Sequence, residues 1–118
     1  MNGRDRLTEK YGIRTVWAID DFIDHAEMAS YLVNLDFEKR DELVYSLAIE
    51  AVMSRLGESV NRMGAQFIAD YPELGLRKIV DNRNLVAHEY HIIVHEVISA
   101  AFEDKLPPIV DALQSLLT

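Results

Sequence analysis

The chain has 118 residues, of which 49% are hydrophobic and none is cysteine, and its formal net charge is −8 from 12 basic and 20 acidic residues. This length and composition predict one compact domain over residues 1–118 and exclude a disordered chain, a disulfide framework and a thiolate metal site. Nucleic-acid binders usually carry a basic face, so the acidic balance argues against broad, non-specific binding of RNA or DNA. It leaves room for a local basic site, for which Arg77, Lys78 and Arg83 are candidates as contacts to phosphate.

The first twelve residues, MNGRDRLTEKYG, are polar and charged and lack the apolar centre of a signal peptide. No stretch of the sequence approaches the roughly 18 apolar residues that a membrane-spanning helix needs. We therefore expect a soluble, cytoplasmic protein that does not enter a membrane.

Apolar residues recur at helical spacing from residue 15 onward and predict a first helix over residues 15–33. Its inward stripe is expected to comprise Val16, Ile19, Ile23, Ala26 and Val33. Three carboxylates lie mostly off this stripe and near the N-terminal half of the helix, where the helix dipole favours negative charge. These are Asp20, Asp21 and Asp24.

A second helix is expected over residues 42–63, with Asp41 as the residue that caps its N-terminus. Apolar residues at helical spacing predict one inward stripe, made of Val44, Leu47, Ala48, Ala51, Val52, Leu56, Val60 and Met63. Another face carries Gly57 among polar residues. A glycine inside a helix costs roughly 1 kcal/mol relative to alanine, so either this loss is tolerated or another helix approaches closely there. The sequence leaves both interpretations open.

Further helices follow in the C-terminal half. Pro72 suits a first helical turn, and the expected core positions after it are Leu76, Ile79, Val80 and Val86. Two helical pieces come next, separated at Pro107 and Pro108, because a helix does not run undisturbed through two prolines. The inward stripe of the last piece comprises Ile109, Leu113, Leu116 and Leu117. The predicted fold is all-α: an up-and-down bundle of four or five helices with short loops.

The stretch from Asp81 to His91, DNRNLVAHEYH, gathers polar groups within a sequence rich in leucine and valine. Asn84 and His88 share a helix face, whereas Arg83 lies about 140° from His88 around a helix but has the reach to join them. An imidazole can move protons at the 2′-hydroxyl or the leaving oxygen of RNA, and a guanidinium can hold the phosphate through two hydrogen bonds. These residue types suit cleavage of RNA without a metal, with Asn84 orienting the imidazole or the phosphate.

Two other interpretations of this stretch stay open. An arginine followed a few residues later by a histidine often occurs by chance. Arg83 and His88 therefore also fit a surface arginine and a histidine at a helix end. His88, His91 and His95 step by three and four residues, which would bring imidazoles together for zinc, but the order HEYH is not that of zinc proteases. No carboxylate is placed to complete an obvious site. We expect neither a metal nor a cofactor, and His25, which stands alone, is expected to be an ordinary surface or half-buried histidine.

The segment RNLVAHEY resembles the R-x4-H-x-Y motif of the HepT family, a branch of the HEPN-domain ribonuclease toxins. Residues 48–63, AIEAVMSRLGESVNRM, are similar to that family's long second helix, with its Gly-Glu pair at Gly57 and Glu58. Residues 71–90, YPELGLRKIVDNRNLVAHEY, and residues 105–113, KLPPIVDAL, resemble two further segments of the family. The similarity extends over roughly residues 16–117. The bare motif is weakly specific, but the ordered set of segments is specific.

The resemblance implies an all-α, HEPN-like bundle that forms a homodimer, with both active sites facing a cleft between the two copies. It implies a metal-independent endoribonuclease toxin in which Arg83 and His88 are catalytic and Asn84 is the polar residue that follows the arginine. Two copies of Arg83 would converge where the phosphate binds, which suits an acidic chain. Tyr90 would be the regulatory tyrosine, to which a partner nucleotidyltransferase of the MNT type, the antitoxin, transfers AMP from ATP. The added charge and bulk would keep an RNA phosphate out.

The sequence departs from the family pattern close to the motif. Leu76 stands where a tryptophan is usual, Asp81 and Asn82 replace a glycine and an apolar residue, and Ser99 replaces a frequent tryptophan. Asp81 would add negative charge near the site, and the sequence does not explain its presence. The altered flanks and the acidic charge motivate a second hypothesis: a catalytically weak HEPN module that acts as a dimeric binding partner of the nucleotidyltransferase.

Overall fold

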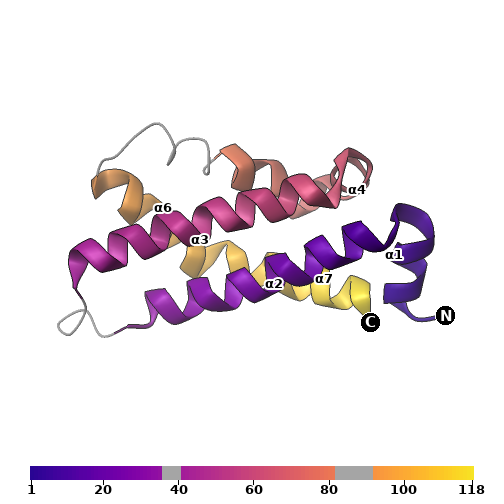
Figure 1. The fold of residues 1–118 in the computed structure, drawn as a ribbon, viewed down its shortest axis with the longest axis horizontal. Coiled ribbons are helices and arrows are strands. Elements are labelled where there is room, and N and C mark those ends of the chain that lie inside the picture. Colours follow the sequence, from indigo (N-terminus) through magenta and orange to yellow (C-terminus); the bar gives the residue numbers. More distant parts are fainter. Residues whose placement is uncertain (36–40, 82–91) are drawn as a thin grey trace.

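The computed structural model describes residues 1–35, 41–81 and 92–118, and their side chains except those of residues 92–97. Within this part of the chain every regular element is helical (Figure 1). In chain order the elements are α1 (Gly3–Tyr11), α2 (Ile13–Val33), α3 (Glu42–Met63), α4 (Ala65–Asp70), the 3-10 helix η1 (Pro72–Leu74), helical residues 76–81, α6 (Ile92–Asp104) and α7 (Leu106–Leu117). The all-α prediction is confirmed, with more helices than the four or five expected.

Two long helices form the length of the molecule. The helices α2 and α3 lie side by side along its 48 Å axis, and α6 and α7 pack against them (Figure 1). Fully burying a large apolar side chain contributes roughly 1.5–3 kcal/mol, so the core holds these helices together. Its fully buried members include Val16, Ile19, Phe22, Ile49, Met53, Leu56, Val60, Met63, Phe67, Leu76, Ile98 and Leu113.

The helix α2 begins two residues earlier than the sequence predicts, at Ile13, where Gly12 turns the chain with a φ of 94°. Its predicted inward stripe is confirmed, since four members are buried and the fifth packs against the core while half-buried. These are Val16, Ile19, Ile23 and Ala26, and then Val33.

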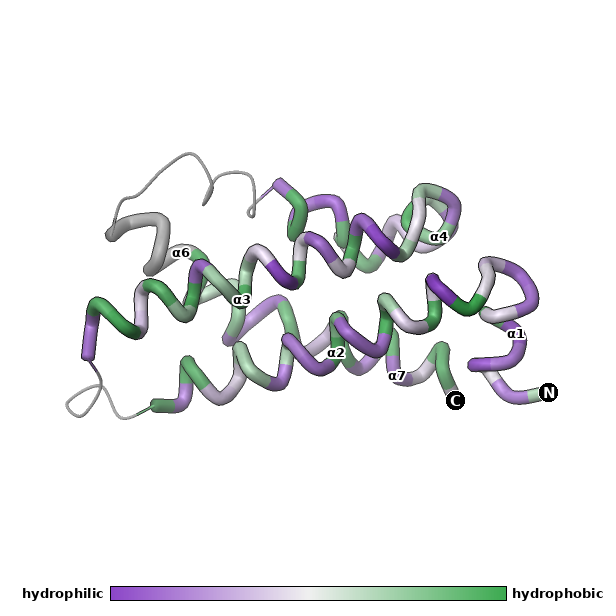
Figure 2. Tube along the Cα trace, in the orientation of Figure 1, coloured by the Kyte–Doolittle hydropathy of each residue, from purple (hydrophilic) through white to green (hydrophobic). Residues whose placement is uncertain are grey.

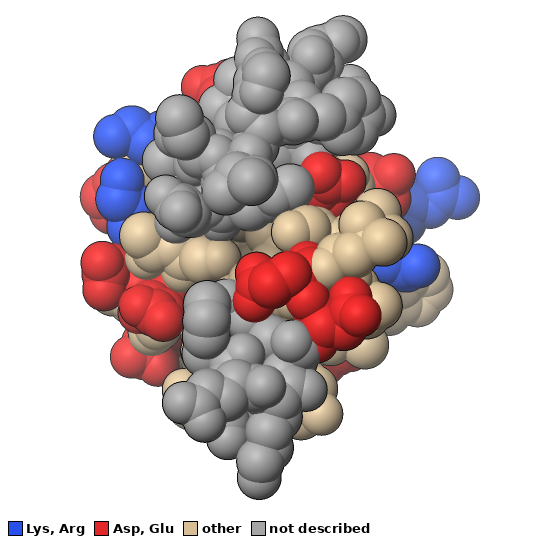
Figure 3. Space-filling model, turned by 90° about the vertical axis from the view of Figure 1, so that its left-hand side faces the viewer, with Lys and Arg blue, Asp and Glu red and all other residues tan. Residues whose placement is uncertain are grey.

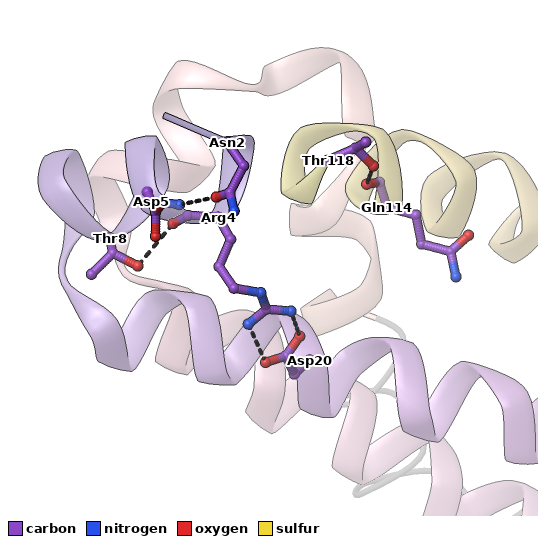
Figure 4. Close-up of polar contacts among 7 residues, drawn as sticks. All are labelled: Asn2, Arg4, Asp5, Thr8, Asp20, Gln114 and Thr118. Carbon is purple, nitrogen blue, oxygen red and sulfur yellow. Dashed lines mark hydrogen bonds and ion pairs between the residues drawn. The ribbon is translucent and has the colours of Figure 1, made fainter.

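The carboxylates of α2 are held by arginines from two other helices. Asp20 accepts hydrogen bonds of 2.8 and 2.9 Å from Arg4, which join α2 to α1 (Figure 4). Asp21 accepts a hydrogen bond of 2.9 Å from Arg62 of α3. Both carboxylates, and Asp24 after them, lie beyond the first turn, within which the effect of the helix dipole falls off. The dipole interpretation is therefore wrong, and Asp20 and Asp21 serve as links between helices.

The helix α3 occupies residues 42–63 as predicted, and Asp41 caps it by accepting a 3.0 Å hydrogen bond from the backbone N–H of Val44. The predicted inward stripe is confirmed only in the C-terminal half, where Gly57 is also buried. The buried stripe residues there are Val52, Leu56, Val60 and Met63.

In the N-terminal half of α3 the predicted stripe is wrong. Val44 is 62% exposed and Leu47 58% exposed, Ala51 is exposed and Ala48 is half-buried. The core contacts in this half come from a neighbouring stripe at the same helical spacing, formed by Tyr45, Ile49 and Met53. Apolar residues cover more than one face of this half of the helix, so periodicity alone does not decide which face turns inward.

The helix α1, which the sequence analysis did not predict, is mostly hydrophilic (Figure 2). Asn2 caps it by accepting a 2.8 Å hydrogen bond from the backbone N–H of Asp5 (Figure 4). Leu7 is buried in the core. Gly3 packs so closely on the end of α7 that an added side-chain carbon would collide with the carbonyl oxygen of Leu116. One leucine and one close backbone approach therefore help to hold a helix that has little apolar periodicity.

The C-terminal end of α1 is tied to α4. The hydroxyl of Tyr11 donates a 2.5 Å hydrogen bond to Asp70, and the Tyr11 ring meets Phe67 edge-on with the ring centroids 5.3 Å apart. The Tyr11 hydrogen bond stabilises the carboxylate and so lowers the pKa of Asp70. Burial, and then the same hydrogen bond, raises the pKa of Tyr11. These contacts close the end of the bundle opposite the start of α6 (Figure 1).

The break between the last two helices is confirmed. The helix α6 ends at Asp104, and α7 begins at Leu106 with Pro107 and Pro108 in its first turn. The backbone nitrogens of a helix's first turn have no hydrogen-bond acceptor within the helix, so a proline there removes no hydrogen bond. Both prolines are therefore accommodated at the start of α7. Leu113 is fully buried and the other predicted inward residues of α7 are half-buried against the core, namely Ile109, Leu116 and Leu117.

Candidate functional site

The residues with the strongest sequence signal fall between two described helices. Arg83, Asn84, His88 and Tyr90 lie outside the described residues, as do Val86 and His91, and the side chain of His95 is likewise not described. The described chain stops at Asp81 and resumes at Ile92. The structure describes the two helices on either side of the segment, and the assignments of Arg83, Asn84, His88 and Tyr90 stay predictions.

The helix that leads into the motif is firmly anchored. Gly75 adopts a φ of 67°, a left-handed conformation that glycine takes without strain, and it starts helical residues 76–81 directly after η1. Leu76, Ile79 and Val80 are buried as predicted. The alternation of buried and exposed residues over these turns leaves Arg77, Lys78 and Asp81 exposed.

The helix that follows the motif is held against α3 by packing and by a hydrogen bond. Ile98 and Phe102 are buried in the core. Tyr45 is buried, and its hydroxyl forms a hydrogen bond with the hydroxyl of Ser99, with the two oxygens 3.1 Å apart. Tyr45 is not among the core residues predicted from the sequence. Its i+4 spacing to Ile49 was the signal for this second stripe.

A cleft of about 610 Å³ lies beside the end of helical residues 76–81. Its charged lining comes from Glu73, Lys78 and Asp81 on one side and Asp104 and Lys105 on the other. The rest of the lining is largely apolar and includes Met53, Leu74, Ile79, Phe102, Leu106 and Ile109. Three carboxylates against two ammonium groups make this cleft mixed in charge rather than a basic phosphate site.

Of the two basic residues predicted to contact phosphate, Lys78 lines this cleft and Arg77 does not. Both side chains are exposed to solvent. Asp81 lines the cleft together with Lys78, so the negative charge expected from the sequence lies at the last described residue before the motif. Lys78 and Asp81 line the same cleft, and Arg77 is not among its lining residues.

Other possible sites are limited in the described part of the chain. No group of three histidine, cysteine, aspartate or glutamate residues there is arranged to hold a metal ion. His25 is half-buried on α2, as expected. None of the described helices is long and apolar enough to cross a membrane.

The arrangement of α2, α3, α6 and α7 defines the class of protein: an all-α bundle of the HEPN-like type, with an R-x4-H-x-Y sequence between helical residues 76–81 and α6. The family model described as "Ribonuclease HepT-like" matches residues 20–116. The chain belongs to this HepT-like ribonuclease family. The matched region contains Arg83, His88 and Tyr90, and it leaves out α1 and the start of α2. No curated protein and no solved structure matches the chain.

Proposed function

We propose that this chain is the toxin of a toxin–antitoxin pair, a metal-independent endoribonuclease that works as a homodimer. The observation that carries the proposal is the intact R-x4-H-x-Y sequence inside the region matched by the ribonuclease family. Arg83 holds the scissile phosphate and stabilises the charge that develops on it. His88 transfers the proton of the attacking 2′-hydroxyl or supplies one to the leaving oxygen, and Asn84 orients these groups.

The acidic balance of the chain fits a site built from two copies better than a broad basic surface. With a net charge of −8 and a mixed-charge cleft beside the motif, one copy offers few cations to an RNA backbone. Two Arg83 side chains facing one phosphate concentrate positive charge where it is needed. Arg77 and Lys78, exposed just before the motif, add contacts to the flanking phosphates.

Purified chain is expected to cleave single-stranded RNA in the presence of EDTA, because the proposed chemistry uses only side chains. The assay requires protein whose intact mass shows no added AMP. Equal rates of cleavage in EDTA and in magnesium support the metal-independent route. Cleavage that appears only with a divalent cation, or none at all with unmodified protein, overturns the proposal.

Tyr90 is the proposed site at which the activity is switched off. A partner nucleotidyltransferase would join the tyrosine oxygen to the α-phosphate of ATP, releasing pyrophosphate and the phenolic proton. The AMP phosphate would then occupy the space that Arg83 and His88 offer to RNA. Co-expression with the nucleotidyltransferase should add one or more AMP units to wild-type chain and none to Tyr90→Phe, as read by intact mass. AMP that persists in Tyr90→Phe refutes this modification site.

A second candidate function is a catalytically weak dimeric binding partner of the nucleotidyltransferase. The observation that favours it is the cleft beside the motif, where Glu73, Asp81 and Asp104 oppose the approach of an RNA backbone. This function predicts a tight complex with the nucleotidyltransferase but no growth arrest when the chain is expressed alone. Growth arrest that is relieved by the nucleotidyltransferase selects the toxin instead.

A further inference from the structure

The cleft beside helical residues 76–81 adjoins the segment that carries the motif. Its volume of about 610 Å³ lies within the roughly 300–1,000 Å³ that is typical of ligand pockets. Its floor is apolar and is built from several helices, with Met53 from α3, Phe102 from α6 and Leu106 from α7. Asp81 lies in its wall, and Arg83 follows two residues later in the sequence. A ligand bound in this cleft is therefore next to the start of the segment that holds the proposed catalytic residues.

Five charged side chains line this cleft, and they are unpaired within the described part of the chain. They are Glu73, Lys78, Asp81, Asp104 and Lys105, and all are exposed. None of them forms an ion pair or a side-chain hydrogen bond with another described residue. The carboxylates of Asp20 and Asp21 differ in this respect, because each binds an arginine of another helix. Charges of both signs around the apolar floor are therefore available to orient a ligand.

Phosphate is a poor ligand for this cleft, whereas a nucleobase suits it. Three carboxylates face two ammonium groups, so the net charge of the lining repels a phosphate. An ionised carboxylate only accepts hydrogen bonds, so it needs a donor from the ligand. Cytosine, adenine and guanine supply a donor through their exocyclic amino groups, and unpaired bases stack their flat rings on side chains. Uracil has a carbonyl oxygen where cytosine has its amino group, and two acceptors would then oppose each other.

We propose that this cleft holds an unpaired RNA base next to the scissile phosphate and selects a base with an exocyclic amino group. Asp81 accepts the hydrogen bond of that amino group, because it is the carboxylate of the lining nearest in sequence to Arg83. Lys78 lies three residues before Asp81, on the same side of the helix, and binds the phosphate beside the base. The inference deepens the proposed ribonuclease function, on which it rests, and gives the charge of Asp81 a role in substrate selection.

The tip of the bundle, where α3 starts, repels an RNA backbone. Among the described residues, acidic side chains occupy the middle of this surface (Figure 3). Asp41 and Glu42 are exposed there. Repulsion between these carboxylates and phosphate favours an RNA chain that runs along the side of the bundle, past the exposed Arg77 and Lys78. That path brings the bases of the RNA to the cleft.

The test is the base preference of cleavage, measured by sequencing the fragments that purified chain produces from a randomised, unpaired RNA pool. At one position beside the cut, wild type should cleave about 10-fold more often next to cytosine than next to uracil. Asp81→Ala should reduce this ratio to within about 2-fold, because the acceptor is lost. Asp81→Asn should cleave next to uracil more often than Asp81→Ala does, since the amide N–H can donate to the uracil oxygen.

Glu103→Ala is the matched control. Glu103 is an exposed carboxylate on α6 beside Asp104 in sequence, and it is not among the residues that line the cleft. Its removal changes the net charge as Asp81→Ala does, and it should keep the wild-type base preference. Wild type that cleaves equally next to all four bases overturns the inference and leaves the ribonuclease standing. A preference that survives in Asp81→Ala, or that Glu103→Ala removes as well, overturns the role of Asp81.

A binding measurement separates the base site from the ribonuclease. Fluorescently labelled oligocytidine and oligouridine are titrated into the His88→Ala chain, with and without Asp81→Ala. Tighter binding of oligocytidine that Asp81→Ala abolishes supports the base site, even where wild type cleaves no RNA and the ribonuclease is refuted. Equal binding of the two probes overturns the site. Asp81→Ala that leaves the base preference intact but weakens binding of the nucleotidyltransferase assigns the cleft to that protein and overturns a base as its occupant.

Discussion

Replacing His88 by alanine is expected to slow RNA cleavage by about 10²–10⁴-fold, the usual contribution of a positioned general acid or base. Arg83→Ala should cause a loss of about 10²–10³-fold, because the phosphate then loses its charged hydrogen-bond partner in the transition state. Single-turnover rates in EDTA at saturating RNA measure both effects. The double variant should lose little more than the worse single variant, since residues that act as a unit are not additive.

Arg14→Ala is the control for these variants. Arg14 is an exposed arginine at the start of α2, at the opposite end of the bundle from the start of α6 (Figure 1). It removes the same charge from the chain without touching the motif, and its cleavage rate should stay within about 2-fold of wild type, as expected for a surface change of under 0.5 kcal/mol. Equal cleavage by wild type, His88→Ala and Arg83→Ala would rule out both catalytic assignments.

The parts of the fold that the sequence predicted are those with a local physical cause. Asp41 caps α3 because its carboxylate oxygen reaches the backbone N–H of Val44, a preference visible in the sequence itself. Pro107 and Pro108 place the start of α7 because neither can continue a preceding helix. Leu76, Ile79 and Val80 are buried because they are the apolar side of a short helix whose other side is charged.

The parts that the sequence did not predict depend on contacts between distant segments. Contacts with distant segments hold α1 in place, among them the burial of Leu7 and the close approach of Gly3 to Leu116, and hydrophobic periodicity does not predict them. The outward position of Leu47 depends on how α3 is rotated against α2 and α6, and Tyr45 and Ile49 compete with it for the core at the same spacing. Tertiary packing chooses between two apolar stripes that the sequence makes equivalent.

The error in the predicted inward stripe of α3 has a physical cause. The start of α3 is apolar on two sides, and among the described residues only the side with Tyr45, Ile49 and Met53 is buried. The candidate site was easier to locate in sequence, because Arg83, His88 and Tyr90 are close along the chain and their chemistry is set by residue type. Arg83, His88 and Tyr90 themselves lie outside the described residues.

Leu76→Ala is expected to lower the free energy of unfolding by about 2–5 kcal/mol, a large part of the stability of a domain of this size. Leu76 is 2% exposed, so its truncation leaves a cavity under the helix that leads into the motif. Denaturant unfolding followed by circular dichroism measures the change. Leu76→Met keeps the volume and should cost less than about 1.5 kcal/mol. Arg77→Ala, on the exposed side of the same turn, should stay within about 0.5 kcal/mol.

The same variants separate stability from catalysis. Leu76 is inside the core, at the first turn of the helix that leads into the motif. Because helical residues 76–81 are anchored only by Leu76, Ile79 and Val80 among their own side chains, loosening the first of these should also misplace the motif segment. Leu76→Ala that remains folded at low temperature should therefore cleave RNA more slowly, whereas Leu76→Met should not. A Leu76→Ala chain that unfolds like wild type would show that this helix is held by other contacts.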